Sequence, residues 1–254
     1  MNRMDPRTTI AGALAMLALL TSCQEQPASE SLQTPAPMAE STFYPNLMER
    51  VEVLMEGAEA IPEERKVELQ ALAQWVTAQL AQSDSADLVF ICTHNSRRSH
   101  LAQVWAQVGA DLRGLDGVRT FSGGTESTAC NPRTVAAMQR AGFEVSVHDQ
   151  DHGEENPTYA VLPGPSSTPQ LCFSKTYGDD ANPAEGFAAV MTCSDADKGC
   201  PIVYGAAARF ATPYVDPKVS DGTGQEAATY DARCAQIGGE MLWMMAQVDP
   251  PVKR

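Results

Sequence analysis

The sequence predicts an α/β domain preceded by a helical extension, and three observations lead to this fold class. An apolar, β-rich run at residues 88–91 passes through a short polar loop into an amphipathic helix. Two further apolar segments, Gly117 to Ser122 and Phe187 to Thr192, are candidate buried strands. Ahead of them, apolar residues recur at helical spacing. Strands that alternate with helices indicate a parallel sheet covered by helices.

The first 42 residues predict export followed by a tether. Two arginines precede an uncharged apolar run, Ile10 to Leu20, which is too short to span a bilayer as a permanent helix. Leu20-Thr-Ser-Cys23 resembles a bacterial lipoprotein cleavage box, which implies a signal peptide at 1–22 and lipidation of Cys23. A plain secretory signal and a wrongly chosen start codon are the alternatives. Residues 23–42 are polar and Pro-rich, as in flexible tethers.

On this interpretation the protein is an exported lipoprotein of the periplasm or cell envelope, and its lipid anchor is its only contact with a membrane. Residues 43–84 then form the helical extension. One apolar stripe runs through Leu47, Met48, Val51, Leu54 and Met55, and a second runs through Leu69, Leu72, Val76 and Leu80. Pro62 stands near the first turn of the second helix, followed by acidic residues. We expect these helices to pack on the main domain, residues 85–250, without forming a site.

The charge of the chain argues against nucleic-acid binding. There are 18 Lys and Arg residues against 32 Asp and Glu, which gives a formal net charge of −14, and no basic patch is visible. Any site for an anion must therefore be a local positive region in an acidic protein.

The most informative stretch is Leu88-Val-Phe-Ile-Cys-Thr-His-Asn-Ser-Arg-Arg-Ser99. A loop that enters a helix N-terminus directs several backbone N–H groups to one point, which suits a tetrahedral oxyanion. The same positive field favours the thiolate of Cys92, and Arg98 can bind two oxygens of the anion. Ser99 can donate a hydrogen bond to the thiolate and Asn95 can brace the loop. The alternative is a buried structural cysteine followed by two surface arginines.

The segment Cys-Thr-His-Asn-Ser-Arg-Arg-Ser resembles the phosphate-binding loop of low-molecular-weight protein tyrosine phosphatases and of the arsenate reductases that share their fold. The resemblance implies a four-stranded parallel sheet flanked by helices. It also implies a substrate-binding loop formed by Thr93, His94, Asn95, Ser96, Arg97, Arg98 and Ser99. His94 replaces the usual Gly, and Arg97 stands where many relatives have a second Cys or another residue. Both departures change the rim of the pocket.

A second informative stretch follows the strand candidate at 187–192, and it reads Cys193-Ser-Asp-Ala-Asp-Lys-Gly-Cys200-Pro. In a parallel sheet the C-terminal strand ends share one edge, so Cys193 should lie on the side of Cys92. Two cysteines without a nearby His are poor support for zinc, and a structural disulfide or a redox relay remain open. If 194–199 is helical, the two Cα atoms lie about 10 Å apart, beyond the disulfide reach of about 7 Å.

This cysteine segment closely resembles the redox segment of thioredoxin-coupled arsenate reductases. The resemblance implies a relay in which Cys92 attacks arsenate, Cys193 attacks the resulting adduct, and Cys200 then forms a disulfide with Cys193. It also implies a thioredoxin-like reductant as partner, and neither a cofactor nor a metal. Asp216-Pro217 resembles the general-acid motif of the whole superfamily, in which the acid protonates the leaving oxygen; a plain Asp-Pro turn is the alternative.

The remaining segments give weaker predictions. Residues 122–128 form a Gly-rich loop that should face the pocket, and Asn131-Pro132 should begin a helix that ends at Gly142. Residues 159–162 and 171–174 are predicted to pair as a hairpin, whereas His148, Asp149, Asp151 and His152 are expected in a solvated loop and not in a metal site. The last helix should bury Cys234 as packing, and Cys130 and Cys172 fit the same role.

The leading interpretation is an arsenate reductase with Cys92, Arg98, Asp216, Cys193 and Cys200 as catalytic residues. The alternative is a low-molecular-weight phosphatase that forms a phospho-Cys92 intermediate, with Cys193 and Cys200 as a structural pair. A non-catalytic oxyanion-binding lipoprotein is a third possibility, disfavoured because a binder needs neither the thiol nor the acid. Export conflicts with a thiol cycle unless a reductant acts outside the cytoplasm.

Overall fold

The computed structural model describes residues 43–149, 152–199 and 202–250. The predicted signal peptide, the tether, Cys23 and Cys200 lie outside the described residues. Asp151 of the acidic and histidine-rich segment does so as well.

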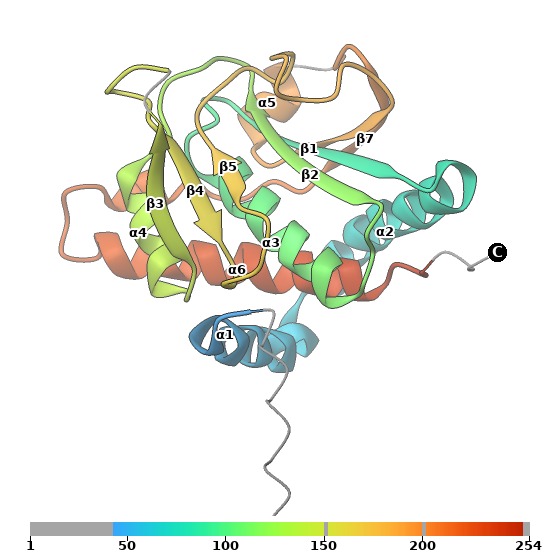
Figure 1. Ribbon diagram of the computed structural model, residues 1–254, viewed down its shortest axis with the longest axis horizontal. Helices are drawn as coiled ribbons and strands as arrows, with labels where there is room; N and C mark the ends of the chain where they lie inside the picture. Colours follow the sequence, from blue (N-terminus) through green and yellow to red (C-terminus); the bar gives the residue numbers. More distant parts are fainter. Residues whose placement is uncertain (1–42, 150–151, 200–201, 251–254) are drawn as a thin grey trace, which may run out of the picture. The chain divides into compact units, whose positions relative to one another are not determined.

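A four-stranded parallel sheet forms the centre of the domain, as the sequence predicts. Its strand order is β2-β1-β6-β7, formed by Val118–Gly124, Ala86–Cys92, Phe187–Met191 and Ala206–Ala211. All three pairings are parallel. Every residue of β6 is buried and β1 is nearly so, which explains their continuous apolar runs. Figure 1 shows β1 and β2 side by side, with α3 (Arg98–Leu112) and α6 (Glu226–Ala246) below them.

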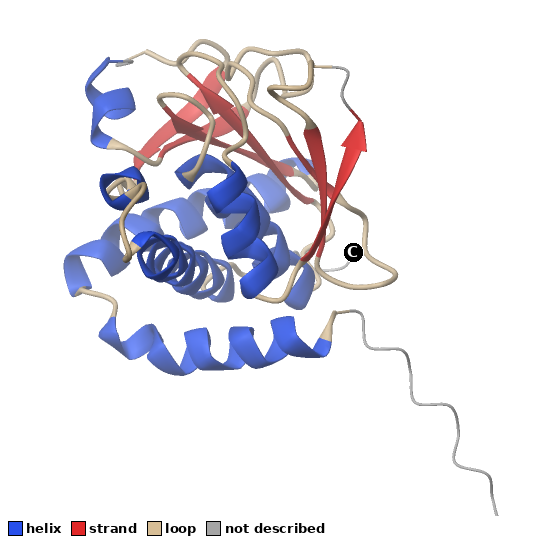
Figure 2. Ribbon diagram, turned by 90° about the vertical axis from the view of Figure 1, so that its left-hand side faces the viewer, coloured by secondary structure: helices blue, strands red, loops and turns tan. Residues whose placement is uncertain are grey.

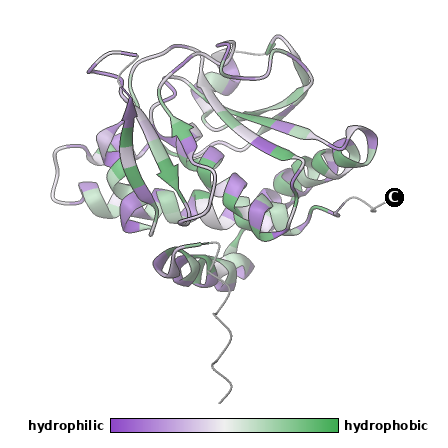
Figure 3. Cartoon of the chain, in the orientation of Figure 1, coloured by the Kyte–Doolittle hydropathy of each residue, from purple (hydrophilic) through white to green (hydrophobic). Residues whose placement is uncertain are grey.

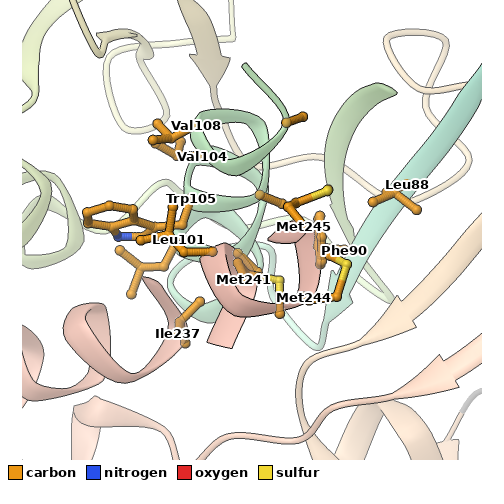
Figure 4. Close-up of a cluster of buried hydrophobic side chains, with 14 of the residues drawn as sticks. Leu88, Phe90, Leu101, Val104, Trp105, Val108, Ile237, Met241, Met244 and Met245 are labelled. Carbon is orange, nitrogen blue, oxygen red and sulfur yellow. The ribbon is translucent and has the colours of Figure 1, made fainter. Parts of the chain in front are cut away.

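The two faces of β1 bury different side chains. Leu88 and Phe90 face a large core shared with α3 and α6, whereas Val89 and Ile91 face a smaller cluster containing Ala196 and Val203. Figure 4 shows the labelled side chains of β1, α3 and α6 meeting in the large core. The smaller cluster places the short helix α5 (Ser194–Gly199) against the opposite face of the sheet.

The N-terminal helices pack on α6. Figure 2 shows a layer of helices below the strands. The N-terminal elements are α1 (Pro45–Glu56), the 3-10 turn η1 (Gly57–Ala60) and α2 (Glu63–Ser83). Their buried leucines and valines join the large core, which agrees with the predicted packing role. The helices carry both hydrophilic and hydrophobic residues, as expected for elements with one buried side (Figure 3). Among the described residues no helix is long and apolar enough to cross a membrane.

A second, antiparallel sheet has the order β3-β4-β5, formed by Glu144–Asp149, Thr158–Leu162 and Gln170–Cys172. The β4–β5 pairing confirms the predicted hairpin. The expectation of a loop at His148 and Asp149 is wrong, because both belong to β3, which pairs with β4. Phe143, Val145 and Val147 alternate with polar residues as in a strand, but the alternation stops before His148 and Asp149, which are polar and not buried on this edge strand.

The remaining predicted helix is α4 (Pro132–Arg140), whose N-cap Asn131 accepts a hydrogen bond from the Arg133 backbone N–H, as expected for an Asn-Pro start. A 3-10 turn, η2 (Pro217–Ser220), precedes α6. In the part of the chain that the structure describes, no group of three His, Cys, Asp or Glu side chains could hold a metal ion.

Candidate active site

The loop between β1 and α3 forms the floor of the site. Cys92 is the last residue of β1 and is buried, and its Sγ lies 3.2 Å from the hydroxyl of Ser99 in the first turn of α3. The amide of Asn95 donates to that same hydroxyl at 2.9 Å. Asn95 adopts a positive φ of 44°, a conformation that Asn tolerates better than most residues and that lets the loop curl over the thiol. These contacts agree with the expected roles of Asn95 and Ser99.

Arg98 begins α3 and is buried beneath the loop. Its Nη1 donates to the Tyr214 carbonyl at 2.9 Å, and its Nη2 donates to Asp216 Oδ2 at 2.7 Å. Its Nε is buried and has no hydrogen-bond acceptor among the described residues. A buried guanidinium donor without an acceptor is costly, so an oxyanion oxygen held above the loop would satisfy it.

The structure brings Asp216 to the loop, as the Asp-Pro motif predicts. One carboxylate oxygen accepts from Arg98 and the other accepts from the Lys218 backbone N–H at 3.1 Å, which fixes Asp216 as the N-cap of η2. The carboxylate is therefore oriented from two sides. It lies at the mouth of the site, where a leaving group could receive a proton.

The two unusual loop residues take different positions. Arg97 lies at the rim: its Nε donates to the Tyr230 hydroxyl at 3.0 Å, and its Nη1 lies 3.7 Å from Asp216 Oδ2. Tyr230 also donates to Asp221, and burial is the largest cause that raises its pKa to about 12. The imidazole of His94 pairs with Glu126 at 2.8 Å and is partly exposed. Both arrangements fit the expectation that these residues change the rim.

The position of Cys193 follows from strand register. Ile91 pairs with Met191, so the end of β1 lies directly beside the end of β6, and neighbouring strands are about 4.8 Å apart. If that register continues, Thr192 lies opposite Cys92 and Cys193 is the next residue along the chain. Cys193 Sγ lies 3.5 Å from the Thr93 hydroxyl and accepts from the Ala196 N–H at 3.3 Å. Both cysteines are buried in the same small cluster.

The segment between Cys193 and Cys200 is helical as α5. The helical case set out above, in which a Cys193–Cys200 disulfide would require the segment to unwind, therefore applies to residues 194–199. Cys200 itself lies outside the described residues.

The other cysteines are enclosed by packing. Cys130, Cys172 and Cys234 are fully buried, and burial raises the pKa of Cys172 to about 12 and that of Cys234 to about 11. Cys234 accepts a hydrogen bond from the Trp105 indole. These environments favour unreactive thiols, in line with the predicted structural role.

The Gly-rich loop after β2 braces the site directly. The N–H groups of Thr125 and Glu126 donate to the carbonyls of Cys92 and Thr93 at 3.1 and 2.9 Å. A Cβ on Gly124 would lie 2.7 Å from the Thr93 carbonyl oxygen and 2.8 Å from the Asn95 nitrogen, so only glycine fits this close approach.

Sequence reasoning missed a second brace, which comes from the segment around β5. Ser174 donates from its hydroxyl to the His94 carbonyl at 2.8 Å, and the Lys175 backbone N–H donates to Asn95 Oδ1 at 3.0 Å. Asn156 holds Ser174 in turn, because its Oδ1 accepts from the Ser174 N–H and its Nδ2 donates to the Ser174 carbonyl, both at 2.9 Å. Single Asn and Ser residues in a loop-rich region form no sequence pattern from which this brace could have been predicted.

Comparison with known proteins agrees with the geometry. Residues 87–158 match the family model described as low molecular weight phosphotyrosine protein phosphatase. The chain is 30% identical over 120 residues to arsenate reductase 2 of Staphylococcus epidermidis, an alignment that covers 47% of this chain and 70% of that protein. The chain is also 31% identical over 120 residues to arsenate reductase 2 of Staphylococcus haemolyticus, again covering 47% of this chain and 70% of that protein.

Solved structures with a similar arrangement include one described as an arsenate reductase in the phosphate-binding state, with a TM-score of 0.40 and 16% identity over 65% of this chain and 99% of that one. Another is a low molecular weight protein tyrosine phosphatase from T. tengcongensis, with a TM-score of 0.40 and 13% identity over 62% of this chain and 95% of that one. The sequence relationship to the staphylococcal proteins and the match to the family model lead to one conclusion: the chain belongs to the low molecular weight phosphotyrosine protein phosphatase family.

Proposed function

We propose that the protein is an arsenate reductase that uses Cys92, Cys193 and Cys200 as a thiol relay. The observation that carries the proposal is the strand register that sets Cys193 beside the Cys92 loop, in one buried cluster. A hydrolytic phosphatase needs a single nucleophilic thiol. A second buried cysteine at the same sheet edge is what a disulfide-forming reductase requires.

Arsenate enters as a tetrahedral oxyanion held by the backbone N–H groups at the start of α3. Its oxygens compete with Asp216 and the Tyr214 carbonyl for the Arg98 guanidinium, and one of them accepts from the buried Nε. The Cys92 thiolate, next to the Ser99 hydroxyl, attacks arsenic. Asp216 donates a proton to the departing oxygen, which leaves as water.

The redox step follows on the Cys92–arsenic adduct. The Cys193 thiolate attacks Cys92 Sγ and forms a Cys92–Cys193 disulfide, while the electron pair of the breaking sulfur–arsenic bond passes to arsenic. Arsenic is reduced from the +5 to the +3 state and leaves as arsenite, and the two thiols are oxidised by two electrons. The proximity of the strand ends carrying the two cysteines makes this transfer intramolecular.

Regeneration uses Cys200 and an external dithiol. The Cys200 thiolate attacks Cys193 Sγ and releases the Cys92 thiolate, which requires α5 to unwind. A thioredoxin-like dithiol then reduces the Cys193–Cys200 disulfide by exchange and becomes a disulfide itself.

Phosphomonoester hydrolysis is the second candidate function. It is favoured by the set formed by Cys92, Arg98 and Asp216, which contains the nucleophile, the anion-binding group and the acid that such hydrolysis needs. In that case Cys193 serves packing alone.

Turnover of two substrates separates the two functions. Arsenite formation is measured with arsenate and a thioredoxin system, and hydrolysis is measured with an aryl phosphate, for the wild type, Cys193→Ser and the buried-cysteine control Cys234→Ser. We expect arsenite formation to vanish in Cys193→Ser alone and any hydrolysis to survive. Aryl phosphate hydrolysis with no arsenate turnover by the wild type would contradict the reductase proposal and leave the phosphatase.

We also propose that the mature protein is a lipoprotein anchored through Cys23, with its reductant outside the cytoplasm. The support is the Leu20-Thr-Ser-Cys23 segment after an apolar run. Metabolic labelling with a radioactive fatty acid should mark the wild type and spare Cys23→Ser. Equal labelling of both would refute the anchor.

A further inference from the structure

A cavity of about 620 Å³ lies apart from the Cys92 loop, between α3, the edge strand β2 and the chain that carries β5. Its walls include Gln103, Thr120, Gln170, Phe173 and Lys175, and none of its lining residues belongs to 92–99. In Figure 1, α3, β2 and β5 lie next to one another at the centre of the molecule.

The notable feature of this cavity is the ammonium group of Lys175. The residue is 95% buried, at 5% relative exposure, and it lines the cavity. Its Nζ lies 4.3 Å from the centroid of the Phe173 ring, yet no carboxylate of the described residues forms an ion pair with it. Burial is the largest cause that lowers the pKa of Lys175. A buried cation without an anionic partner is unfavourable, particularly in a chain with a net charge of −14.

The other cation on the cavity wall already has a partner. Both the Nε and the Nη2 of Arg119 bond the Asp87 carboxylate at 2.7 Å, and the Arg119 side chain is largely exposed. Lys175 is therefore the group that an incoming anion would meet inside.

A second polar atom in the wall also lacks a partner. Gln103 Oε1 is buried and has no donor among the described residues, whereas its Nε2 donates to Gln170 Oε1 at 3.3 Å. The acidic lining residue Asp111 stands eight positions further along α3, about 12 Å from Gln103 along the helix axis. Asp116 is a second acidic residue of the lining, and the carboxylate of Asp179 acts electrostatically on Lys175 without an ion pair among the described residues. In Lys175 and Gln103 the cavity thus offers one positive group without an ion pair and one free acceptor.

We propose that this cavity is a binding site for a small hydroxylated organic anion, whose carboxylate or phosphate pairs with Lys175 and whose hydroxyl donates to Gln103 Oε1. The site is separate from the oxyanion loop and does not depend on which reaction that loop performs. Ligand binding should reach the loop nonetheless, because the Lys175 backbone N–H holds Asn95.

Calorimetric titration tests the proposal with L-malate, glycerol 3-phosphate and succinate, which lacks the hydroxyl. The proteins are the wild type, Lys175→Met, Lys175→Arg, Gln103→Leu and the matched control Lys66→Met on α2. Loss of one charge-assisted bond corresponds to roughly 1.5–3 kcal/mol, so we expect Lys175→Met to weaken malate or glycerol 3-phosphate binding by about 10- to 100-fold. Lys175→Arg and Lys66→Met should retain binding. Succinate should bind the wild type more weakly than malate.

The loop variant Arg98→Ala identifies where the ligand binds. Binding that persists in Arg98→Ala supports the cavity, whereas binding lost there and unchanged in Lys175→Met would assign it to the Cys92 loop and overturn the proposal. Absence of saturable binding by all three probes to the wild type would overturn it too. If Lys175→Met does not fold, acetylation of Lys175 in the wild type, followed by mass spectrometry, replaces it. Malate or glycerol 3-phosphate should slow that acetylation, and an unchanged rate contradicts the proposal.

Discussion

Replacing Asn156 with alanine should loosen the Cys92 loop from a distance. The Asn156 side chain accepts from the Ser174 N–H at 2.9 Å and from the Cys130 N–H at 3.4 Å, and it donates to the Ser174 carbonyl. The variant leaves the buried N–H groups of Ser174 and Cys130 without this acceptor. The Ser174 carbonyl keeps one donor, the Ser127 hydroxyl. At about 1–3 kcal/mol for each buried group left unpaired, and less for the longer bond, we expect a loss of roughly 2–4 kcal/mol in the free energy of unfolding.

The loss should also affect Cys92 itself, because Ser174 in turn holds the His94 carbonyl. A displacement of about 1 Å in a positioned group can cost about 100-fold in rate. We therefore expect alkylation of Cys92 by iodoacetate, an anion that enters the same cradle, to slow by roughly 10-fold or more. Urea unfolding and the alkylation rate measure the two effects.

Asn182→Ala is the matched control. Asn182 is similarly buried and lies in the connection between β5 and β6. Its side chain bonds the Thr176 and Tyr177 carbonyls at 3.3 and 3.2 Å and makes no bond to the Cys92 loop. Its alkylation rate should stay within about twofold of the wild type, since no bond to the loop is lost. The reasoning is refuted if the free energy of unfolding of Asn156→Ala lies within about 0.5 kcal/mol of the wild-type value, which is about the uncertainty of such measurements. It is also refuted if both variants slow alkylation equally.

Three further predictions concern other parts of the site. Asp216→Asn should lower the rate of the first chemical step by about 100-fold or more and change its pH profile, as measured by rapid quench; an unchanged rate would exclude Asp216 as the acid. His100 is buried against Ser122, and burial is the largest cause that lowers its pKa to about 3. In the unfolded state this histidine takes up a proton below its ordinary pKa of 6.5, whereas in the folded state it stays neutral. The free energy of unfolding therefore falls as the pH drops from 6.5 towards 3. Between pH 6.5 and 5 this amounts to about 2 kcal/mol, so wild type should lose that much more than His100→Gln in urea unfolding, and equal losses would refute it. Gly124→Ala should slow Cys92 alkylation about 10-fold or more, because its Cβ would displace the loop. Gly57→Ala should leave that rate unchanged, because its Cβ would meet no atom within 4 Å and its φ of −74° suits alanine.

The sequence was sufficient for three strands of the central sheet and for the Cys92 loop, but it did not locate the fourth strand, β7. Buried parallel strands appear as unbroken apolar runs, and β1 and β6 both show one. The Cys92 loop could be recognised because its residues act at fixed spacing along one local segment. Cys193 was expected beside Cys92 because it follows a strand that ends at the same edge of the sheet, and the two strand ends do lie side by side. Asp216 was expected there because Asp216-Pro217 resembles a general-acid motif, and its carboxylate does contact Arg98.

The brace and the cavity were not accessible to that reasoning. Asn156 and Ser174 act through single hydrogen bonds between segments that are distant from the loop in sequence. Lys175 is one lysine among exposed ones until packing buries it. The end of β3 was missed because His148 and Asp149, on an exposed edge strand, carry no apolar signal.

Trapping of the mixed disulfide tests the central claim most directly. Cys200→Ser is incubated with one equivalent of arsenate, alkylated, digested without reduction and analysed by mass spectrometry. The proposed relay predicts a Cys92–Cys193 cross-linked peptide in an amount equal to the arsenite released, and none with phosphate in place of arsenate. Arsenite release without that cross-link, or a cross-link from Cys92 to any other cysteine, would contradict the assignment of Cys193 as the second thiol.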